Sequence, residues 1–322
     1  HALEASSDPA RAEAAADRLL NLVPGAGHLV HMPSHIFFRI GRYNDAAQAN
    51  LRAAEVDEAY IAACNAQGFY PAAYYPHNIH FLWSASTMQG QSALSIDSAR
   101  RVVANVRVEQ VEAFPTIEFF RTVPLLSLVR FAKWDAILAE PQPHEGFMFA
   151  RSVWHYARGV AYAAKGQTDA AKAELALLEP LKDDVSVRFL DSRDYPGSAL
   201  VGIAIHLLHG EIAYRAGEFG SAAGHFEQAV LAQDQLPYTE PPFWYYPTRQ
   251  SLGAALFADG KHVEAEQVFK KDLQQYPHNG WSMFGLAQSL IAQGKTAEAA
   301  KARMHFETIW QFADVELTAS IL

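Results

Sequence analysis

The sequence is poor in cysteine, in basic residues and in long apolar runs. Its single cysteine, Cys64, excludes a disulfide within the chain. Acidic residues number 35 and basic residues 26, for a formal net charge of −9. No basic stripe is present, although nucleic-acid binding depends on clustered lysine and arginine. No apolar run approaches the roughly 20 residues that a membrane-spanning helix needs. We therefore expect neither a nucleic-acid partner nor a membrane span.

Strand-like runs of valine, isoleucine and threonine are also few, whereas half of the residues are hydrophobic. A short pattern recurs instead: a glycine, an aromatic residue or histidine two positions later, and an alanine five positions later. With weaker copies included, these turns are anchored at Gly41, Gly90, Ala132, Gly166, Gly217, Gly260 and Gly294. Small residues lie seven positions before five of the anchors, at Ser34, Gly159, Gly210, Gly253 and Ala287. The pattern predicts closely packed pairs of helices joined by tight turns.

This pattern resembles the tetratricopeptide repeat. The third and fourth anchors, and the last two, are 34 residues apart, which is the period of that repeat. The resemblance implies an all-α fold, a right-handed superhelical solenoid of antiparallel helix pairs that forms one domain over residues 1–322. Counting back one period from Gly41 assigns about residues 1–24 to a truncated first unit. That unit would have His1 in the middle of a helix, so we expect the natural chain to begin earlier.

In this repeat the first helix of each pair lines a concave groove. The groove positions of the first units hold His28, His31, His35, His77 and His80, with His1 and Glu4 in the truncated unit. Spacings of three and four residues place side chains on one helical face. At 14 histidines in 322 residues, six groove positions would hold about a quarter of one histidine by chance. The cluster therefore favours a shared site over isolated histidines that each make a local hydrogen bond.

A cluster of this kind predicts a metal site, because neutral imidazole is the commonest metal ligand. The expected ligands are His31, His35, His77, His80 and His1, with Glu4 nearby. Pro33 favours a kink or a late helix start, which would leave His28 in the preceding loop or outside the direct ligands. Imidazoles without cysteine suit copper or zinc better than magnesium or calcium. A dinuclear copper centre and a hydrolytic zinc centre both fit. Copper bound by the amine of His1 is disfavoured, because the register places that residue in mid-helix.

Two aromatic segments, about residues 69–75 and 240–249, are candidates for the walls of a substrate pocket. Within them Tyr75, Glu240 and Arg249 are the expected substrate-side residues. Arg249 would act as a clamp for a carboxylate or a phosphate. The alternative is that the aromatic rings only pack between repeats.

Two histidine motifs, HMPSHI at residues 31–36 and YYPHNIH at residues 74–80, resemble a group of bacterial tetratricopeptide-repeat proteins. Several members of that group look exported, to the periplasm or out of the cell, but the resemblance implies no reaction. We expect a metalloenzyme that acts on a small organic substrate, either a copper oxidoreductase or a zinc hydrolase. The alternatives are a non-catalytic scaffold that binds peptides or partner proteins in the groove, and a metal carrier.

Overall fold

The chain is described by a computed structural model over residues 1–66 and 70–322, and this part contains helices and turns but no strand. Residue 69, at the start of the first aromatic segment, lies outside the described residues. The helices are α1 Glu13–Leu19, α2 Gly27–His31, α3 Pro33–Arg39, α4 Tyr43–Cys64, α5 Tyr75–Met88, α6 Ser92–Ala104, α7 Val108–Ala113, α8 Val123–Arg130, α9 Trp134–Ala139, α10 Met148–Ala164, α11 Thr168–Leu178, α12 Val185–Asp191, α13 Gly197–Arg215, α14 Phe219–Asp234, α15 Arg249–Ala258, α16 His262–Gln275, α17 Gly280–Ala292 and α18 Thr296–Ile309. Shorter or differently wound turns are η1 Pro9–Ala12, η2 Tyr70–Tyr74, η3 Pro115–Thr122 and η4 Glu179–Asp183. The all-α prediction is confirmed. In the described ranges, no helix has the length and apolarity that crossing a membrane requires.

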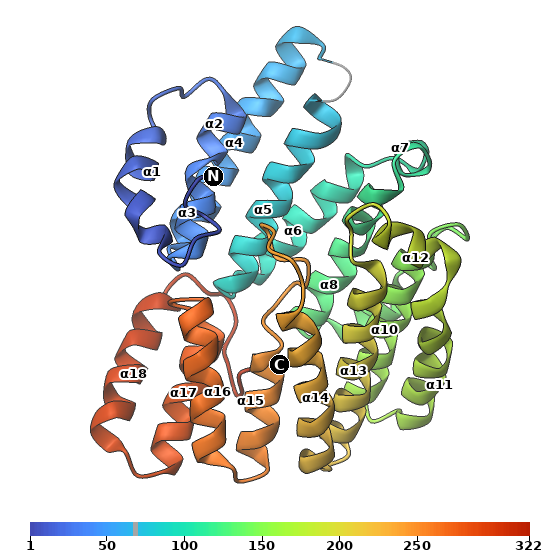
Figure 1. The fold of residues 1–322 in the computed structure, drawn as a ribbon, viewed down its shortest axis with the longest axis vertical. Helices are drawn as coiled ribbons and strands as arrows, with labels where there is room; N and C mark the ends of the chain where they lie inside the picture. Colours follow the sequence, from blue (N-terminus) through green and yellow to red (C-terminus); the bar gives the residue numbers. More distant parts are fainter. Residues whose placement is uncertain (67–69) are drawn as a thin grey trace.

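All seven anchor residues lie in turns between helices. Their φ angles are positive, from 54° at Ala132 to 80° at Gly41, and glycine adopts this region without the steric cost that other residues meet. The turns join α3 to α4, α5 to α6, α8 to α9, α10 to α11, α13 to α14, α15 to α16 and α17 to α18 (Figure 1). The repeat pattern in the sequence therefore marks the helix pairs of the fold.

Glycines let the two helices of a pair approach closely. A Cβ atom added at Gly210 would overlap the Phe226 ring, and one added at Gly253 would overlap the Phe269 ring. Phe226 and Phe269 are each 1% exposed. The missing side chain on one helix thus creates the space that a buried aromatic ring of the partner helix fills.

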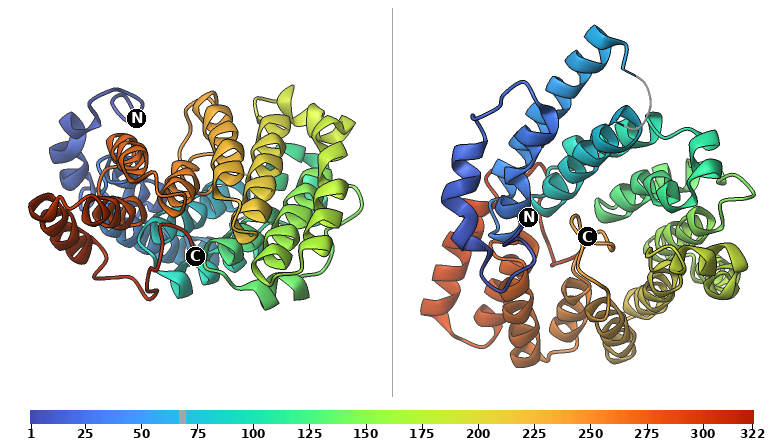
Figure 2. Two further views of the ribbon diagram at one scale, coloured as in Figure 1. Left: turned by 90° about the horizontal axis from the view of Figure 1, so that it is seen from below. Right: turned by 45° about the horizontal axis from the view of Figure 1, so that its top comes forward.

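The array of helix pairs returns to its beginning, so that α17 and α18 lie beside the first helices (Figures 1 and 2). Asp314 accepts hydrogen bonds from the backbone N–H groups of Ser92, at 2.6 Å, and Ala93, at 2.9 Å, where α6 begins. The indole N–H of Trp281 donates to the backbone oxygen of Thr87 at 3.2 Å. These contacts join the last helix pair to the turn between α5 and α6.

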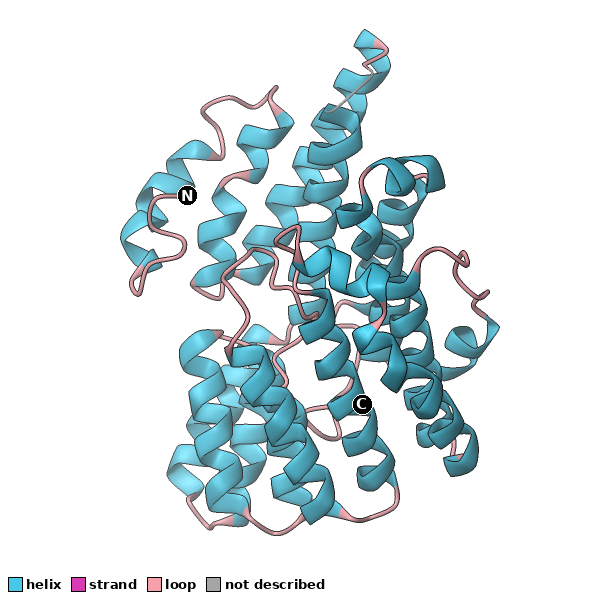
Figure 3. Cartoon of the chain, turned by 45° about the vertical axis from the view of Figure 1, so that its right-hand side comes forward, coloured by secondary structure: helices cyan, strands magenta, loops and turns pink. Residues whose placement is uncertain are grey.

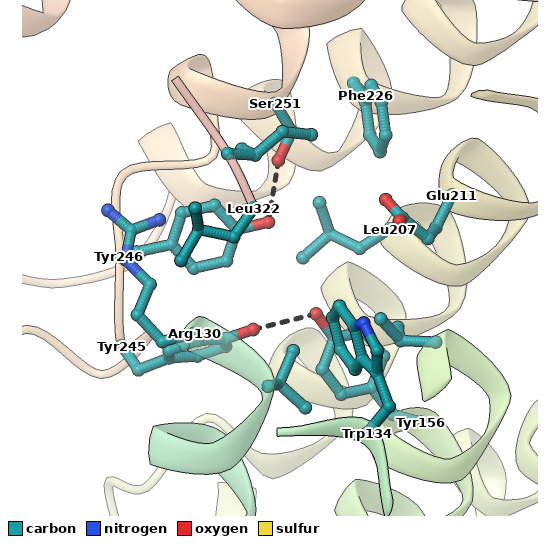
Figure 4. Close-up of a pocket in the computed structure, with 13 residues that line it drawn as sticks. Arg130, Trp134, Tyr156, Leu207, Glu211, Phe226, Tyr245, Tyr246, Ser251 and Leu322 are labelled. Atoms are coloured by element: carbon teal, nitrogen blue, oxygen red, sulfur yellow. Dashed lines mark hydrogen bonds between the residues drawn. The ribbon is translucent and has the colours of Figure 1, made fainter. Parts of the chain in front are cut away.

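Two largely non-helical segments cross the interior of this array, residues 235–248 between α14 and α15 and residues 310–322 after α18 (Figure 1). Figure 3 shows the loops of the molecule in pink. In Figure 4, Leu322 lies among aromatic side chains, where the hydroxyl groups of Tyr156 and Tyr245 are 3.0 Å apart. Tyr245 is 6% exposed and belongs to the largest hydrophobic core. The groove expected from the sequence is therefore partly occupied by the chain itself.

The beginning of the chain differs from the prediction. Residues 2–7 form turns and bends, so His1 does not lie in a helix. The reason is Pro9, which starts η1 and disfavours helical geometry at the residue before it. Asp8 accordingly has φ −136° and ψ 71°.

Candidate metal centre

His31 and His35 are carried by two short helices that meet at Pro33. Helix α2 ends at His31 and α3 begins at Pro33, which lacks the N–H group that a continuous helix would need. The helix is thus interrupted at Met32, although the backbone of this residue keeps αR angles. His28, however, lies inside α2 and not in a loop. His77 comes from the first turn of α5, where Pro76 occupies an initial position that favours a helix start.

The side chains of His31, His35 and His77, called here the histidine trio, converge on one point. Nε2 of His31 lies 2.9 Å from Nε2 of His35 and 3.2 Å from Nε2 of His77. One nitrogen of each of the three lies within 4.8 Å of the other two. Nitrogens bound tetrahedrally at about 2.05 Å from a metal ion are about 3.3 Å from each other. The trio is therefore spaced almost as ligands of one ion are.

Asn50 fixes the tautomer of the neutral His31 ring. The Asn50 amide N–H group donates to the backbone oxygen of Ala46 at 2.7 Å, so the amide oxygen faces Nδ1 of His31, at 2.6 Å. Nδ1 must therefore carry the proton of the neutral imidazole. The lone pair of His31 is left on Nε2, which points at the other two rings.

Glu240 plays the corresponding role for His35. Its Oε2 lies 2.9 Å from Nδ1 of His35, and its Oε1 accepts a hydrogen bond from the Tyr238 hydroxyl group. Burial raises the pKa of Glu240 to about 8. An ionised Glu240 accepts a hydrogen bond from the Nδ1–H group of His35, which leaves the lone pair of the ring on Nε2. A protonated Glu240 instead donates a hydrogen bond to Nδ1, which leaves the ring proton on Nε2.

Protons alone cannot satisfy the trio. Nε2 of His31 has one lone pair and faces two nitrogens, those of His35 and His77. One lone pair accepts one good hydrogen bond, so at least one short N···N contact stays unfavourable. Burial lowers the pKa of both His35 and His77 to about 4, so an added proton is also disfavoured near neutral pH. A metal ion bound by three lone pairs removes the conflict.

The other predicted ligands of this region lie on the opposite side of His35. Glu4 Oε2 is 3.5 Å from Nδ1 of His35 and 2.8 Å from Nδ1 of His1. These three residues form a second group of donor atoms within 4.8 Å. The ligands expected around one ion are thus divided between the two nitrogens of His35.

His80 and His28 do not join the trio. The His80 ring stacks on Trp83, with centroids 5.0 Å apart, and contacts Phe119 and Phe120 edge-on. It lies one turn farther along α5 than His77, where η3 packs against the helix. His28 stacks on His31 with centroids 5.6 Å apart, which places it beside a ligand and not among the ligands.

Two of the substrate-side candidates are also committed elsewhere. The Tyr75 hydroxyl group donates to Glu58 at 2.6 Å. The Arg249 guanidinium group pairs with Asp234 at 2.5 Å and is 5% exposed, so it is not free to clamp a substrate. Arg249 opens α15, where the pair stabilises the buried start of the helix. Only Glu240 of the three candidates lies beside the trio.

Asn50 and Tyr238 are parts of the site that the sequence analysis did not identify. Asn50 is fully buried on α4, in a helix face that also contains Ala46, Ala49 and Ala53. A lone amide in such a face is a signal that could have pointed to it. Tyr238 follows α14 in a connection whose path the repeat pattern does not predict.

Comparison with known proteins supports the repeat. Residues 256–302, from the end of α15 through α17 into α18, match the family model described as tetratricopeptide repeat. The predicted tetratricopeptide repeat is confirmed in this segment. No curated protein matches the chain.

Three solved structures illustrate the distant similarity of the chain to known folds. A tetratricopeptide repeat protein from Parabacteroides merdae is 11% identical, with 89% of this chain and 98% of that chain covered and a TM-score of 0.38. A chain of the APC/C hetero-tetramer Cut9-Hcn1 is 13% identical, with 92% of this chain and 56% of that chain covered and a TM-score of 0.32. This chain thus spans little more than half of that one. The P58(IPK) TPR domain is 13% identical, with 95% of this chain and 90% of that chain covered and a TM-score of 0.30.

Proposed function

We propose that the protein is a helical-repeat metalloprotein in which His31, His35 and His77 bind one copper or zinc ion. The observation that carries the proposal is the pair of short contacts made by Nε2 of His31, 2.9 Å and 3.2 Å to two other ring nitrogens. Asn50 leaves this nitrogen with a single lone pair, and a metal ion relieves both contacts where a proton relieves one.

The donor set supports the choice of metal. Three imidazoles with no thiolate suit copper or zinc, and they do not suit magnesium or calcium, which require oxygen ligands. Hydrogen bonds that the remote ring nitrogens donate to Asn50 and Glu240 are the outer contacts that metal-bound histidines make. Glu4 and His1 lie on the far side of His35 and supply no donor to the same point.

We further propose that the centre is catalytic. Three protein ligands leave one coordination position of a tetrahedral ion, which is the arrangement of catalytic zinc sites. His77 and Glu240 both line a cavity large enough for a small organic molecule. A metal ion there would polarise a substrate oxygen or activate water or dioxygen, and Glu240 can hold or release a proton beside His35.

The test is metal content of protein purified without a polyhistidine tag, incubated with zinc or copper and then dialysed. We expect about one tightly held ion per chain in the original protein, and below about one-tenth in His31→Ala and His77→Ala. His209→Ala, which changes a partly exposed histidine on α13, serves as the matched control and should keep its metal. Circular dichroism checks that each variant is folded. Loss of the ion from the original protein on dialysis would overturn the proposal.

A non-catalytic scaffold is the second candidate, because residues 256–302 match the tetratricopeptide repeat and such repeats often bind peptides. The interior segments occupy part of the groove that an extended peptide would use. A protein that retains no metal in the experiment above would favour the scaffold. A protein that retains metal but turns over no substrate would favour a metal carrier.

A further inference from the structure

A cavity of about 280 Å³ lies beside the histidine trio. It is bounded by α5, η3, α8, α10 and residues 239–244 of the interior connection. Its walls include His77, His80, Trp83, Phe119, Tyr195 and Phe243, and we call it the aromatic cavity. Because His77 and Glu240 belong both to its wall and to the candidate metal centre, a molecule in the cavity would lie next to the ion.

Aromatic side chains shape the cavity for a flat ring. Phe119 and Tyr195 are stacked, with centroids 5.3 Å apart and planes 13° apart. Phe243 meets the Tyr195 ring edge-on at 5.4 Å. Aromatic pairs add about 0.5–1.5 kcal/mol beyond the burial of their area, so a ligand ring that packs against these aromatic side chains gains both terms. A volume slightly below the usual range for drug-sized ligands restricts the molecule to one or two rings.

The charge of the lining restricts the molecule further. No lysine or arginine occurs among the described residues that line the aromatic cavity, and Glu240 is the one carboxyl group there. In the metal-free protein, an anionic ligand would lose its hydration without gaining a cationic partner from the wall. The lining therefore favours a neutral molecule.

His80 supplies a polar contact in this apolar wall. Its ring is 8% exposed, lies on Trp83, and makes no hydrogen bond with any residue that the structure describes. Burial lowers the pKa of His80 to about 3, so the imidazole is neutral and offers one donor and one acceptor. Buried polar groups are nearly always hydrogen-bonded in folded proteins, and an unpartnered imidazole in a cavity wall indicates a ligand or a water molecule.

We propose that the aromatic cavity binds a neutral aromatic molecule that carries a hydroxyl group, with its ring against Phe119 and Tyr195 and its hydroxyl group on His80. As the substrate class of the metal centre this assignment rests on the proposed function, whereas binding itself does not. His80, expected from the sequence to bind the metal, becomes a contact to the substrate.

Isothermal titration calorimetry of the metal-free protein with 2-naphthol and 2-naphthoate tests the assignment. We expect saturable binding of 2-naphthol at one site, and binding of 2-naphthoate that is at least tenfold weaker. His80→Phe keeps the stacked ring but removes both nitrogens, and should weaken 2-naphthol binding about two- to tenfold, the worth of one hydrogen bond. His80→Gln, which can still form a hydrogen bond, should bind more tightly than His80→Phe, and His209→Phe should bind like the original protein.

The result is separable from that of the metal experiment. His31→Ala, with the metal site removed, should still bind 2-naphthol. Binding of 2-naphthol by an original protein that retains no metal on dialysis would keep the cavity assignment and refute the metal centre. Equal binding of 2-naphthoate, no saturable binding of 2-naphthol, or unchanged binding by His80→Phe would each overturn the assignment. Metal retained together with any of these outcomes would leave the metal centre standing without this substrate class.

Discussion

Two groups of histidines on neighbouring helices differ sharply in this protein. In the histidine trio, His31 and His35 are buried and His77 is partly buried, and the Nε2 atoms are directed at one point. His206, His209 and His225, called here the outer histidine group, lie half-buried on α13 and α14. In the outer group the rings of His209 and His225 are stacked, with their centroids 4.8 Å apart and an angle of 9° between their planes. A carboxylate oxygen of Glu179 lies 3.1 Å from Nε2 of His209. Both groups contain three histidines, but the ring nitrogens converge only in the group where other residues hold rings in place.

The largest expected difference between the two groups is in stabilisation by metal. At free zinc a thousandfold above the dissociation constant, binding to the native state adds about 4 kcal/mol to the free energy of unfolding. His31→Ala should lose this increase, while the triple variant H206A/H209A/H225A should retain it. Urea denaturation with and without zinc measures both. A triple variant that loses the increase would place the metal at the outer histidine group.

The next difference concerns the residue that orients a ligand. Asn50→Leu removes the acceptor for Nδ1 of His31, so the ring is free to take either tautomer. We expect metal affinity to fall about 10- to 100-fold, as is usual when an outer contact of a metal-bound histidine is lost. Glu179→Leu removes the contact to His209 and should leave the affinity unchanged. Competition with a chromogenic chelator gives the two affinities, and equal losses would contradict the comparison.

Acid should destabilise the metal-free protein through the trio. The native pKa of His77 is about 4, against 6.5 for an unperturbed histidine, so the unfolded chain binds more protons between these values. Stability contributed by the neutral ring is therefore complete above about pH 6.5 and is lost as the pH falls towards 4. For one such imidazole the loss from pH 7 to pH 5 is about 2 kcal/mol.

His77→Gln should reduce this loss, as measured by urea denaturation at pH 7 and pH 5. His225→Gln should reduce it less, because burial lowers the pKa of His225 while leaving the ring partly accessible to water. The same pH dependence in both variants would show that the two groups do not differ in this respect.

The smallest effect is expected from His209→Ala. Its contact with Glu179 is an exposed pair, and such pairs are worth about 0–1 kcal/mol. The free energy of unfolding at pH 7 should change by no more than about 0.5 kcal/mol. A loss above about 2 kcal/mol would show that the outer histidine group stabilises the fold much as a buried group does.

The sequence predicts the local part of this structure well and the distant part poorly. The positive φ values at Gly41 and Gly294 follow from turn chemistry that is written in neighbouring residues. The approach of His31, His35 and His77 follows from spacing along two helices. His80 shares that spacing, but its surroundings come from η3, a segment that has no place in the repeat pattern.

The role of Glu240 shows the limit most clearly. The sequence identifies it as a residue of an aromatic segment, yet it lies 205 positions from His35, with which it forms a hydrogen bond. Its position depends on the path of the interior connection and on the return of the last helices to the first. Neither is encoded in a periodic pattern, because both depend on how small rotations between helix pairs add up over the whole array.

The contact of Asp314 and Trp281 with the turn between α5 and α6 has a consequence for how the protein unfolds. In an open repeat array, the terminal units have one neighbour each and fray first. Here the pair α17–α18 contacts the pair α5–α6, and this contact braces both pairs. Unfolding therefore does not begin from an unsupported face of either pair. Cutting that brace, for example by Asp314→Ala, should turn a single cooperative transition into a gradual one and release the early helices that carry the histidines.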